Sequence, residues 1–209
     1  MGPRPASIVL LVLAALLALL GPGWGVAPAH ALPVLEVSVD EAARRLAPGG
    51  YALLIRHATT DPGTGDPPGF TVDDCATQRN LSAAGRSEAA ALGQALRTRG
   101  VRIDEVRSSA WCRCLDTARL AFGEPRPWPP LNSFFGERSR ADAQTAAVRV
   151  EIARIAPPRL VAMVTHQVNI SALVDVFPAQ GEVIAVRWRD GNLYPEFRFR
   201  VAPTASTAR

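Results

Sequence analysis

The fold is decided by residues 51–57, which read Tyr-Ala-Leu-Leu-Ile-Arg-His. Five apolar residues follow turn residues at positions 48–50, and a short apolar run bounded in this way is typical of a buried strand. The run then ends in Arg56 and His57. Ligands in an open α/β sheet bind beyond the carboxyl ends of the strands, so this first strand already predicts a site at its end.

Outward from this strand, the chain alternates between strand-like and helix-like patterns. The further predicted strands are residues 101–106 and 160–164, with a closing hairpin of residues 183–188 and 193–201 around Asp190-Gly191-Asn192. The predicted helices are residues 38–46, 82–99, 110–122, 137–155 and 170–176. This order predicts an α/β fold, a three-layer α/β/α sandwich with a mainly parallel sheet and a C-terminal antiparallel hairpin. Residues 59–78 are rich in Asp, Gly, Pro and Thr, which predicts a long loop that is either functional or mobile.

The N-terminal 31 residues have the layout of a secretory signal peptide. Arg4 precedes an uncharged apolar stretch at residues 7–20, and Ala29-His30-Ala31 supplies the small-x-small pattern of a cleavage point. An uncleaved anchor is the rival interpretation, but the stretch is shorter than the roughly 20 residues of a membrane span. We therefore expect cleavage after residue 31, a single domain at residues 32–201, a flexible tail at 202–209, and a periplasmic or secreted protein.

The composition excludes several chemistries. The 209 residues are 48% hydrophobic and 20% charged, which is the balance of a globular protein. All 23 basic residues are arginines, so a Schiff-base lysine and a Walker-type phosphate lysine are both excluded. The net charge of +4 is small and scattered, which gives no reason to expect nucleic acid as a partner.

Polar side chains follow all three predicted strands of the parallel sheet. Besides Arg56 and His57, these are Arg113 after the second strand and His166 after the third. Neighbouring parallel strands would gather the four side chains into one pocket. Two guanidiniums and two imidazoles suit a tetrahedral oxyanion such as phosphate, because Arg binds phosphate oxygens in bidentate geometry and keeps its charge. A neutral imidazole can also attack phosphorus, and this scheme requires no metal and no cofactor.

Four segments of the chain resemble the motifs of one known family, the histidine phosphatase superfamily (phosphoglycerate mutase-like, branch 1). Residues 54–58, Leu-Ile-Arg-His-Ala, resemble its RHG signature with Ala in place of Gly, and residues 80–86, Asn-Leu-Ser-Ala-Ala-Gly-Arg, resemble its helix start. Residues 108–118, Ser-Ser-Ala-Trp-Cys-Arg-Cys-Leu-Asp-Thr-Ala, resemble its second arginine segment, and residues 164–166 its second histidine segment. The resemblance implies that His57 becomes phosphorylated and that Arg56, Arg113 and His166 bind phosphate.

One part of the family pattern is missing, the general acid. Family members often carry a Glu after the Pro-rich connection or an Asp directly after the second His, whereas this chain has Asn132 and Gln167 there. Glu137 is the nearest carboxylate and becomes the candidate acid, with three other carboxylates as alternatives: Asp73, Asp74 and Asp142. The hypothesis is therefore a phosphatase with either a displaced acid or an easily released leaving group.

The three cysteines are interpreted as one disulfide and one free thiol. In an exported chain, Cys75 is expected to pair with Cys112 or Cys114 and so hold the long loop against the helix of Arg113. A metal site built from these cysteines is disfavoured, because their spacing fits no zinc motif.

The hairpin arginines are read first as a solvated face, with weak contact to an anionic envelope surface as the rival interpretation. They are Arg187, Arg189, Arg198 and Arg200.

Together these features predict an exported phosphomonoesterase that acts through phospho-His57 on a small-molecule or envelope sugar phosphate. The alternatives are a mutase that transfers a phosphoryl group and a noncatalytic phosphate-binding module on the same fold.

Overall fold

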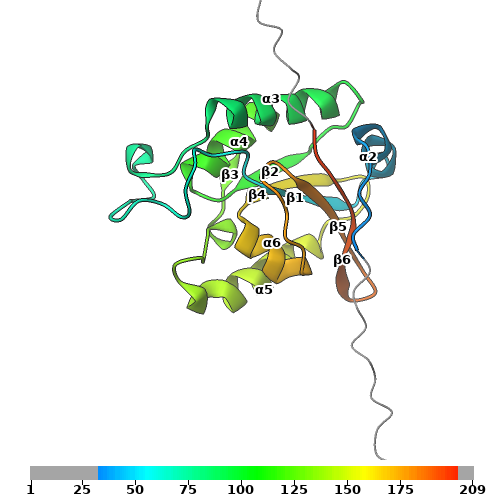
Figure 1. Ribbon diagram of the computed structural model, residues 1–209. Helices are drawn as coiled ribbons and strands as arrows, with labels where there is room; N and C mark the ends of the chain where they lie inside the picture. Colours follow the sequence, from blue (N-terminus) through cyan, green and yellow to red (C-terminus); the bar gives the residue numbers. More distant parts are fainter. Residues whose placement is uncertain (1–32, 202–209) are drawn as a thin grey trace, which may run out of the picture. The chain divides into compact units, whose positions relative to one another are not determined.

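The computed structural model describes residues 33–201, which build a six-stranded mixed sheet with helices on both faces (Figure 1). The strands are β1 (Tyr51–Arg56), β2 (Glu105–Ser108), β3 (Arg126–Pro127), β4 (Leu160–Thr165), β5 (Val183–Arg189) and β6 (Asn192–Phe199). The α-helices are α2 (Val39–Leu46), α3 (Ala83–Arg97), α4 (Cys112–Phe122), α5 (Ala141–Ile152) and α6 (Gln167–Val174). Short 3₁₀ turns are η1 (Cys75–Thr77), η2 (Pro129–Leu131) and η3 (Arg138–Arg140). The signal peptide and tail predicted from the sequence lie outside the described residues.

The strand order is β3-β2-β4-β1-β5-β6, and β3, β2, β4 and β1 run parallel to one another. β5 pairs antiparallel with both β1 and β6. A tight turn joins β5 to β6, with positive φ angles of 50° at Asp190 and 75° at Gly191, as short hairpin turns require. The predicted mainly parallel sheet with a C-terminal antiparallel hairpin is thus confirmed.

The sheet divides the apolar core into two layers. Leu53 and Ile55 pack with buried residues of α2, α3 and α4, whereas Ala52 and Leu54 pack with those of α5 and α6. Successive side chains of a strand point to opposite faces, so the continuous apolar run of β1 supplies both layers. Figure 1 shows α2, α3 and α4 on one side of the sheet and α5 and α6 on the other. This is the predicted three-layer sandwich.

Three elements differ from the prediction by three residues or more at one end or both: the second strand, the helix predicted at 137–155, and the helix predicted at 170–176, which is observed at Gln167–Val174. The second strand begins at Glu105 and not at residue 101, because the backbone N–H of Val101 bonds Leu96 O and so closes the end of α3. Val101 is nevertheless buried, which explains why its segment has the apolar character of a strand. The helix predicted at 137–155 begins at Ala141, after the η3 turn, and ends at Ile152.

Ser82 begins α3 as its N-cap, accepting a hydrogen bond of 3.1 Å from the N–H of Gly85. A Cβ at Gly85 would lie 1.8 Å from the carbonyl oxygen of Thr59. The glycine of this motif therefore lets α3 approach the segment that follows β1 closely, which fixes the start of the long loop.

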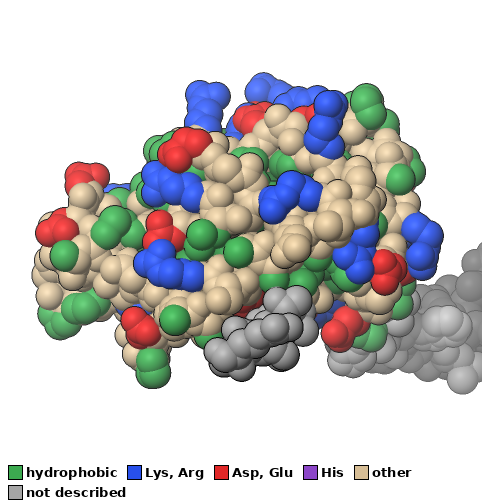
Figure 2. Space-filling model, turned by 90° about the horizontal axis from the view of Figure 1, so that it is seen from above, with side chains coloured by type: hydrophobic (Ala, Val, Ile, Leu, Met, Phe, Trp, Pro, Cys, Tyr) green, Lys and Arg blue, Asp and Glu red, His purple; other side chains and the backbone are tan. Residues whose placement is uncertain are grey.

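The charged surface is mixed in sign. Figure 2 shows arginine and acidic side chains interspersed on the face above the sheet. The hairpin arginines also have partners within the chain: the Tyr51 ring for Arg187, the Tyr194 ring for Arg189, Glu182 for Arg198 and Glu88 for Arg200. Within residues 33–201, no helix is long and apolar enough to span a membrane.

Candidate active site

Three parallel strands end side by side and bring the predicted site residues together. In the register of the sheet, Arg56 of β1 pairs with Thr165 of β4, so the residues that follow, His57 and His166, emerge at the same edge. The His57 N–H also donates to Thr165 O at 3.0 Å. The two imidazole centroids lie 5.6 Å apart with the rings nearly perpendicular, and both side chains are buried.

The protonation of the His57 ring follows from one contact. Its Nδ1 lies 2.9 Å from the carbonyl oxygen of Ala58. A carbonyl oxygen only accepts hydrogen bonds, so Nδ1 must carry the ring proton and Nε2 holds a free electron pair in the neutral ring. Burial, followed by the positive charges of Arg113 and Arg56, lowers the pKa of His57 from 6.5 to about 3, although the Ala58 bond acts in the opposite direction. His57 is therefore a neutral imidazole with an unprotonated Nε2 at neutral pH.

His166 lies in a second, distinct environment. Its Nε2 is 2.9 Å from the Ser109 hydroxyl and 3.5 Å from the Sγ of Cys114, and its ring stands edge-on to Trp111 at 5.5 Å. Burial first, and then the charges of Arg113 and the other nearby cations, hold the pKa of His166 well below its usual value. The Ser109 hydroxyl therefore orients this imidazole and belongs to the site, although the sequence analysis assigned it no role.

Three guanidiniums surround the two imidazoles, and one of them was missed in the sequence. Arg56 donates to Pro178 O at 2.8 Å, and both Arg56 and Arg113 keep a buried Nε–H without a partner in the described part of the chain. The third is Arg79: burial first, and then the charges of Arg79 and Arg113, lower the pKa of Arg56. Like charges crowded in this way are costly unless an anion joins them, so the cluster fits a bound oxyanion.

The long loop contributes a carboxylate that the sequence analysis did not single out. Asp66 Oδ1 lies 2.6 Å from Nη1 of Arg113, and Asp66 Oδ2 lies 3.2 Å from Nη2 and 3.0 Å from Nε1 of Trp111. The backbone N–H of Arg79 donates to the same carboxylate at 3.1 Å. The sequence indicated only that a long loop follows the first histidine. It did not indicate which residue of that loop enters the site.

The carboxylates considered as the general acid lie on the surface. Glu137 is 55% exposed at its side chain and pairs with Arg140 at 2.8 Å. Of the alternatives, Asp74 caps the η1 turn, and Asp73 and Asp142 are exposed. None of the contacts found within residues 33–201 joins Glu137 to either histidine, so its catalytic role stays a prediction.

A disulfide joins the loop to the helix that carries Arg113. Cys75 pairs with Cys112, with a Cα–Cα distance of 5.7 Å, while Cys114 is free and buried. The pairing is one of the two predicted. The bond fixes the end of the loop at the first residue of α4, and burial raises the pKa of the Cys114 thiol to about 12, which leaves it un-ionised.

Backbone contacts hold the histidine segment from both sides. The N–H of Ala58 donates to the Thr117 hydroxyl at 3.0 Å, and the Gly181 N–H bonds the carbonyl oxygens of Arg56 and His57. The Thr of the second arginine segment thus ties α4 to the first histidine segment. Ala58 is fully buried, so its methyl group is accommodated where the family motif has Gly.

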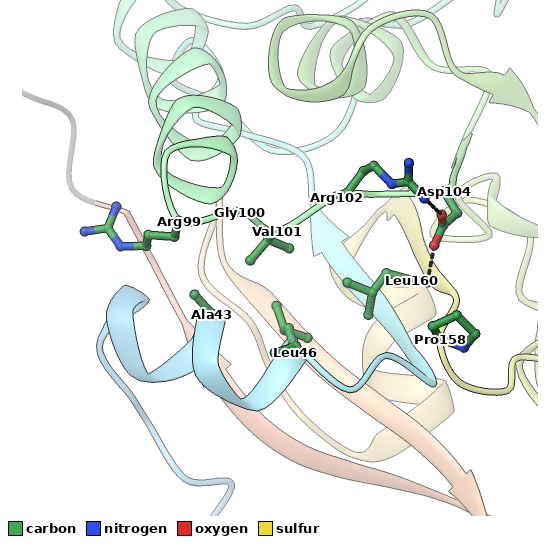
Figure 3. Close-up of a pocket in the computed structure, with 10 residues that line it drawn as sticks. Ala43, Leu46, Arg99, Gly100, Val101, Arg102, Asp104, Pro158 and Leu160 are labelled. Atoms are coloured by element: carbon green, nitrogen blue, oxygen red, sulfur yellow. Dashed lines mark hydrogen bonds and ion pairs between the residues drawn. The ribbon is translucent and has the colours of Figure 1, made fainter.

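A separate pocket lies near the start of the parallel strand β4, at the end opposite the histidines. Figure 3 shows Leu46 of α2, Val101 after α3 and Leu160 at the start of β4 around it. Because β4 has six residues at ~3.3 Å each, this pocket and His166 are separated by roughly 20 Å. The pocket is therefore not part of the histidine site.

Comparison with known proteins shows what the sequence and the fold resemble. A sequence model of the histidine phosphatase superfamily (branch 1) matches residues 52–135. Among solved structures, the protein histidine phosphatase SixA complexed with tungstate aligns with a TM-score of 0.51 and 17% identity, covering 72% of this chain and 96% of that chain. The α-ribazole phosphatase from Shigella flexneri aligns with a TM-score of 0.48 and 19% identity, covering 74% of this chain and 96% of that chain. A mutant phosphoserine phosphatase from Entamoeba histolytica in complex with phosphoserine aligns with a TM-score of 0.48 and 15% identity, covering 68% of this chain and 93% of that chain. No curated protein sequence matches the chain.

The fold is that of a phosphoglycerate mutase-like α/β protein. Residues 52–135 match the histidine phosphatase superfamily, branch 1, whose members are phosphatases and mutases. This confirms the resemblance found in the sequence.

Proposed function

We propose that the protein is an exported phosphatase that hydrolyses phosphomonoesters through a phosphohistidine on His57, without a metal ion. The observation that carries the proposal is the Nδ1 contact of His57 with Ala58 O, together with the low pKa of the ring. A neutral imidazole with Nε2 free is the form that attacks phosphorus. Phosphoryl transfer otherwise needs mostly positioning and charge stabilisation, which three adjacent guanidiniums supply.

The neighbouring groups take complementary roles in this proposal. Arg56, Arg79 and Arg113 would hold the phosphate oxygens and offset the charge that develops during transfer. In the tautomer whose Nε2 accepts from the Ser109 hydroxyl, Nδ1 of His166 carries the ring proton, and in this proposal that N–H would donate to the phosphoryl group.

Export and the substrate class rest on the sequence. The N-terminal signal pattern and the disulfide both suit an oxidising compartment, where a periplasmic or secreted phosphatase would meet small sugar phosphates or envelope sugar phosphates. Weak contact of the hairpin arginines with an anionic envelope surface remains part of the proposal, although these side chains are paired within the chain.

Trapping the phosphoenzyme tests the function. The protein is mixed with a ³²P-labelled phosphomonoester and quenched within milliseconds in alkaline denaturant, because phosphohistidine is labile to acid. We expect a transient labelled protein that His57→Ala abolishes, with inorganic phosphate as the product. A noncatalytic binding module would give no label at all, and a mutase would pass the label to an added alcohol in preference to water. Either result contradicts the proposal.

A further inference from the structure

The strongest unexplained feature of the site is the buried ion pair between Asp66 and Arg113. The side chains of Asp66 and Arg113 are only 6% and 5% exposed. The Asp66 carboxylate receives four hydrogen bonds, two from Arg113, one from the Trp111 ring N–H and one from the Arg79 N–H. A carboxylate is thus bound at the guanidinium that the proposed function assigns to phosphate.

The charges of the cluster favour a phosphate dianion over a carboxylate as the ligand of Arg113. Three guanidiniums face one carboxylate, and the two imidazoles are neutral. Once Asp66 leaves as the neutral acid, the three guanidiniums carry three positive charges, and a phosphate dianion neutralises two of them where the carboxylate neutralised one. A dianion with three acceptor oxygens therefore competes well with a carboxylate for Arg113.

We infer that Asp66 is the general acid of this phosphatase, stored on Arg113 as a carboxylate and released in protonated form when the phosphate group of the substrate takes its place. The inference rests on the proposed function and supplies the acid that the family motifs lack in this chain. It also gives the long loop a catalytic role, because the loop places Asp66 in direct contact with Arg113, the arginine that would bind phosphate.

The change in protonation follows from the surroundings of Asp66. Burial raises the pKa of this carboxyl, but the hydrogen bond and charge of Arg113, with the N–H groups of Arg79 and Trp111, bring it below its usual value. Once Arg113 binds phosphate, its lowering influence weakens, burial remains and a dianion lies nearby. Each of these changes favours the neutral acid, so proton uptake should accompany binding.

The proposed chemistry balances in two displacements. In the first, His57 Nε2 forms a bond to phosphorus, the ester P–O bond breaks, and the Asp66 proton moves to the leaving oxygen to give the free alcohol. In the second, a water molecule gives one proton to the Asp66 carboxylate and its oxygen attacks phosphorus. The P–N bond then breaks and its electron pair returns to Nε2 of His57. Inorganic phosphate is released, and Asp66 ends the step in its protonated form.

A leaving-group comparison tests the inference. The rate of His57 phosphorylation is measured by rapid quench with 4-nitrophenyl phosphate, whose phenolate leaves without help, and with an alkyl phosphate, whose alkoxide does not. Asp66→Asn keeps the size of the side chain and loses the proton. We expect it to slow the alkyl ester by about 10²–10⁴-fold and the nitrophenyl ester by less than about tenfold. Asp61→Asn, an exposed acid of the same loop, is the matched control and should leave both rates unchanged.

Two further measurements separate catalysis from folding. Calorimetric titration with inorganic phosphate in two buffers of different ionisation heat counts the protons taken up. Asp66→Asn should bind phosphate at least as tightly as the unchanged protein and take up fewer protons. Asp66→Glu, which restores an acid, should recover part of the alkyl-ester rate.

Three outcomes would overturn the inference. They are equal slowing of both esters by Asp66→Asn, an unchanged alkyl-ester rate, and a selective loss for alkyl esters in Glu137→Gln with none in Asp66→Asn. Failure of the unchanged protein to form any phosphohistidine is a different result, because it contradicts the proposed function itself.

Discussion

Acid should destabilise the folded protein through its buried imidazoles, and His57 gives the size of the effect. In the unfolded chain its pKa is the ordinary 6.5, and in the folded protein burial and nearby arginines lower that pKa to about 3. Between these values the unfolded state binds a proton that the folded state does not. The stabilisation is therefore fully present above about pH 6.5 and is lost as the pH falls, at ~1.4 kcal/mol per pH unit.

Between about pH 7 and about pH 5, this single group should lower the free energy of unfolding by about 2 kcal/mol. The pKa of His166 is shifted in the same direction, so its contribution adds to that of His57. Urea unfolding at both pH values measures the loss for the unchanged protein and for His57→Gln, whose amide does not titrate. We expect the loss in free energy of unfolding between the two pH values to be about 2 kcal/mol smaller in His57→Gln than in the unchanged protein. The other titrating groups contribute to both proteins and therefore cancel when the two losses are subtracted. The same pH dependence in both proteins would refute the argument that His57 is buried as a neutral ring.

Three further changes test separate parts of the site. Arg79→Gln should weaken binding of inorganic phosphate by about 10–150-fold in calorimetry, the worth of one charge-assisted hydrogen bond. Cys75→Ser opens the bond to Cys112 across 37 residues and should lower the free energy of unfolding by about 3–4 kcal/mol, measured with denaturant, whereas reductant should have no further effect on the variant. Gly181→Ala places a Cβ at φ +72° and 2.4 Å from the Glu88 carboxyl group, so it should cost more than about 1 kcal/mol of stability in thermal unfolding.

The parts of the site that stand on strands were predictable from the sequence. β1 and β4 pair in register from Tyr51 with Leu160 to Arg56 with Thr165, so equal strand lengths place His57 and His166 at one edge. A short apolar run with a polar end is enough to predict this placement, because the period of a strand and the ladder of a parallel sheet leave little freedom. The same argument failed for residues 101–104, where Val101 is buried and Ile103 half-buried without pairing in the sheet, so the segment has the apolar signature of a strand.

The parts that stand on the long loop were not predictable. The loop contains Asp61, Asp66, Asp73 and Asp74, and its sequence has no periodicity that distinguishes them. Only Asp66 pairs with Arg113, because the path of the loop is set by contacts distant in sequence. These include the disulfide to the start of α4 and the bond of the Arg79 side chain with Gly65 O.

This difference changes how a missing acid should be sought in such a site. Glu137 was favoured by its distance in sequence from a motif, but its side chain is 55% exposed and pairs with another surface residue. A general acid must lie within reach of the leaving oxygen and must become protonated when substrate binds. Both conditions are met more readily by a carboxylate that shares a guanidinium with the phosphate, because the substrate then removes the cation that kept the carboxylate ionised. The contact with Arg113, and not proximity to a motif, is therefore the physical criterion that selects Asp66.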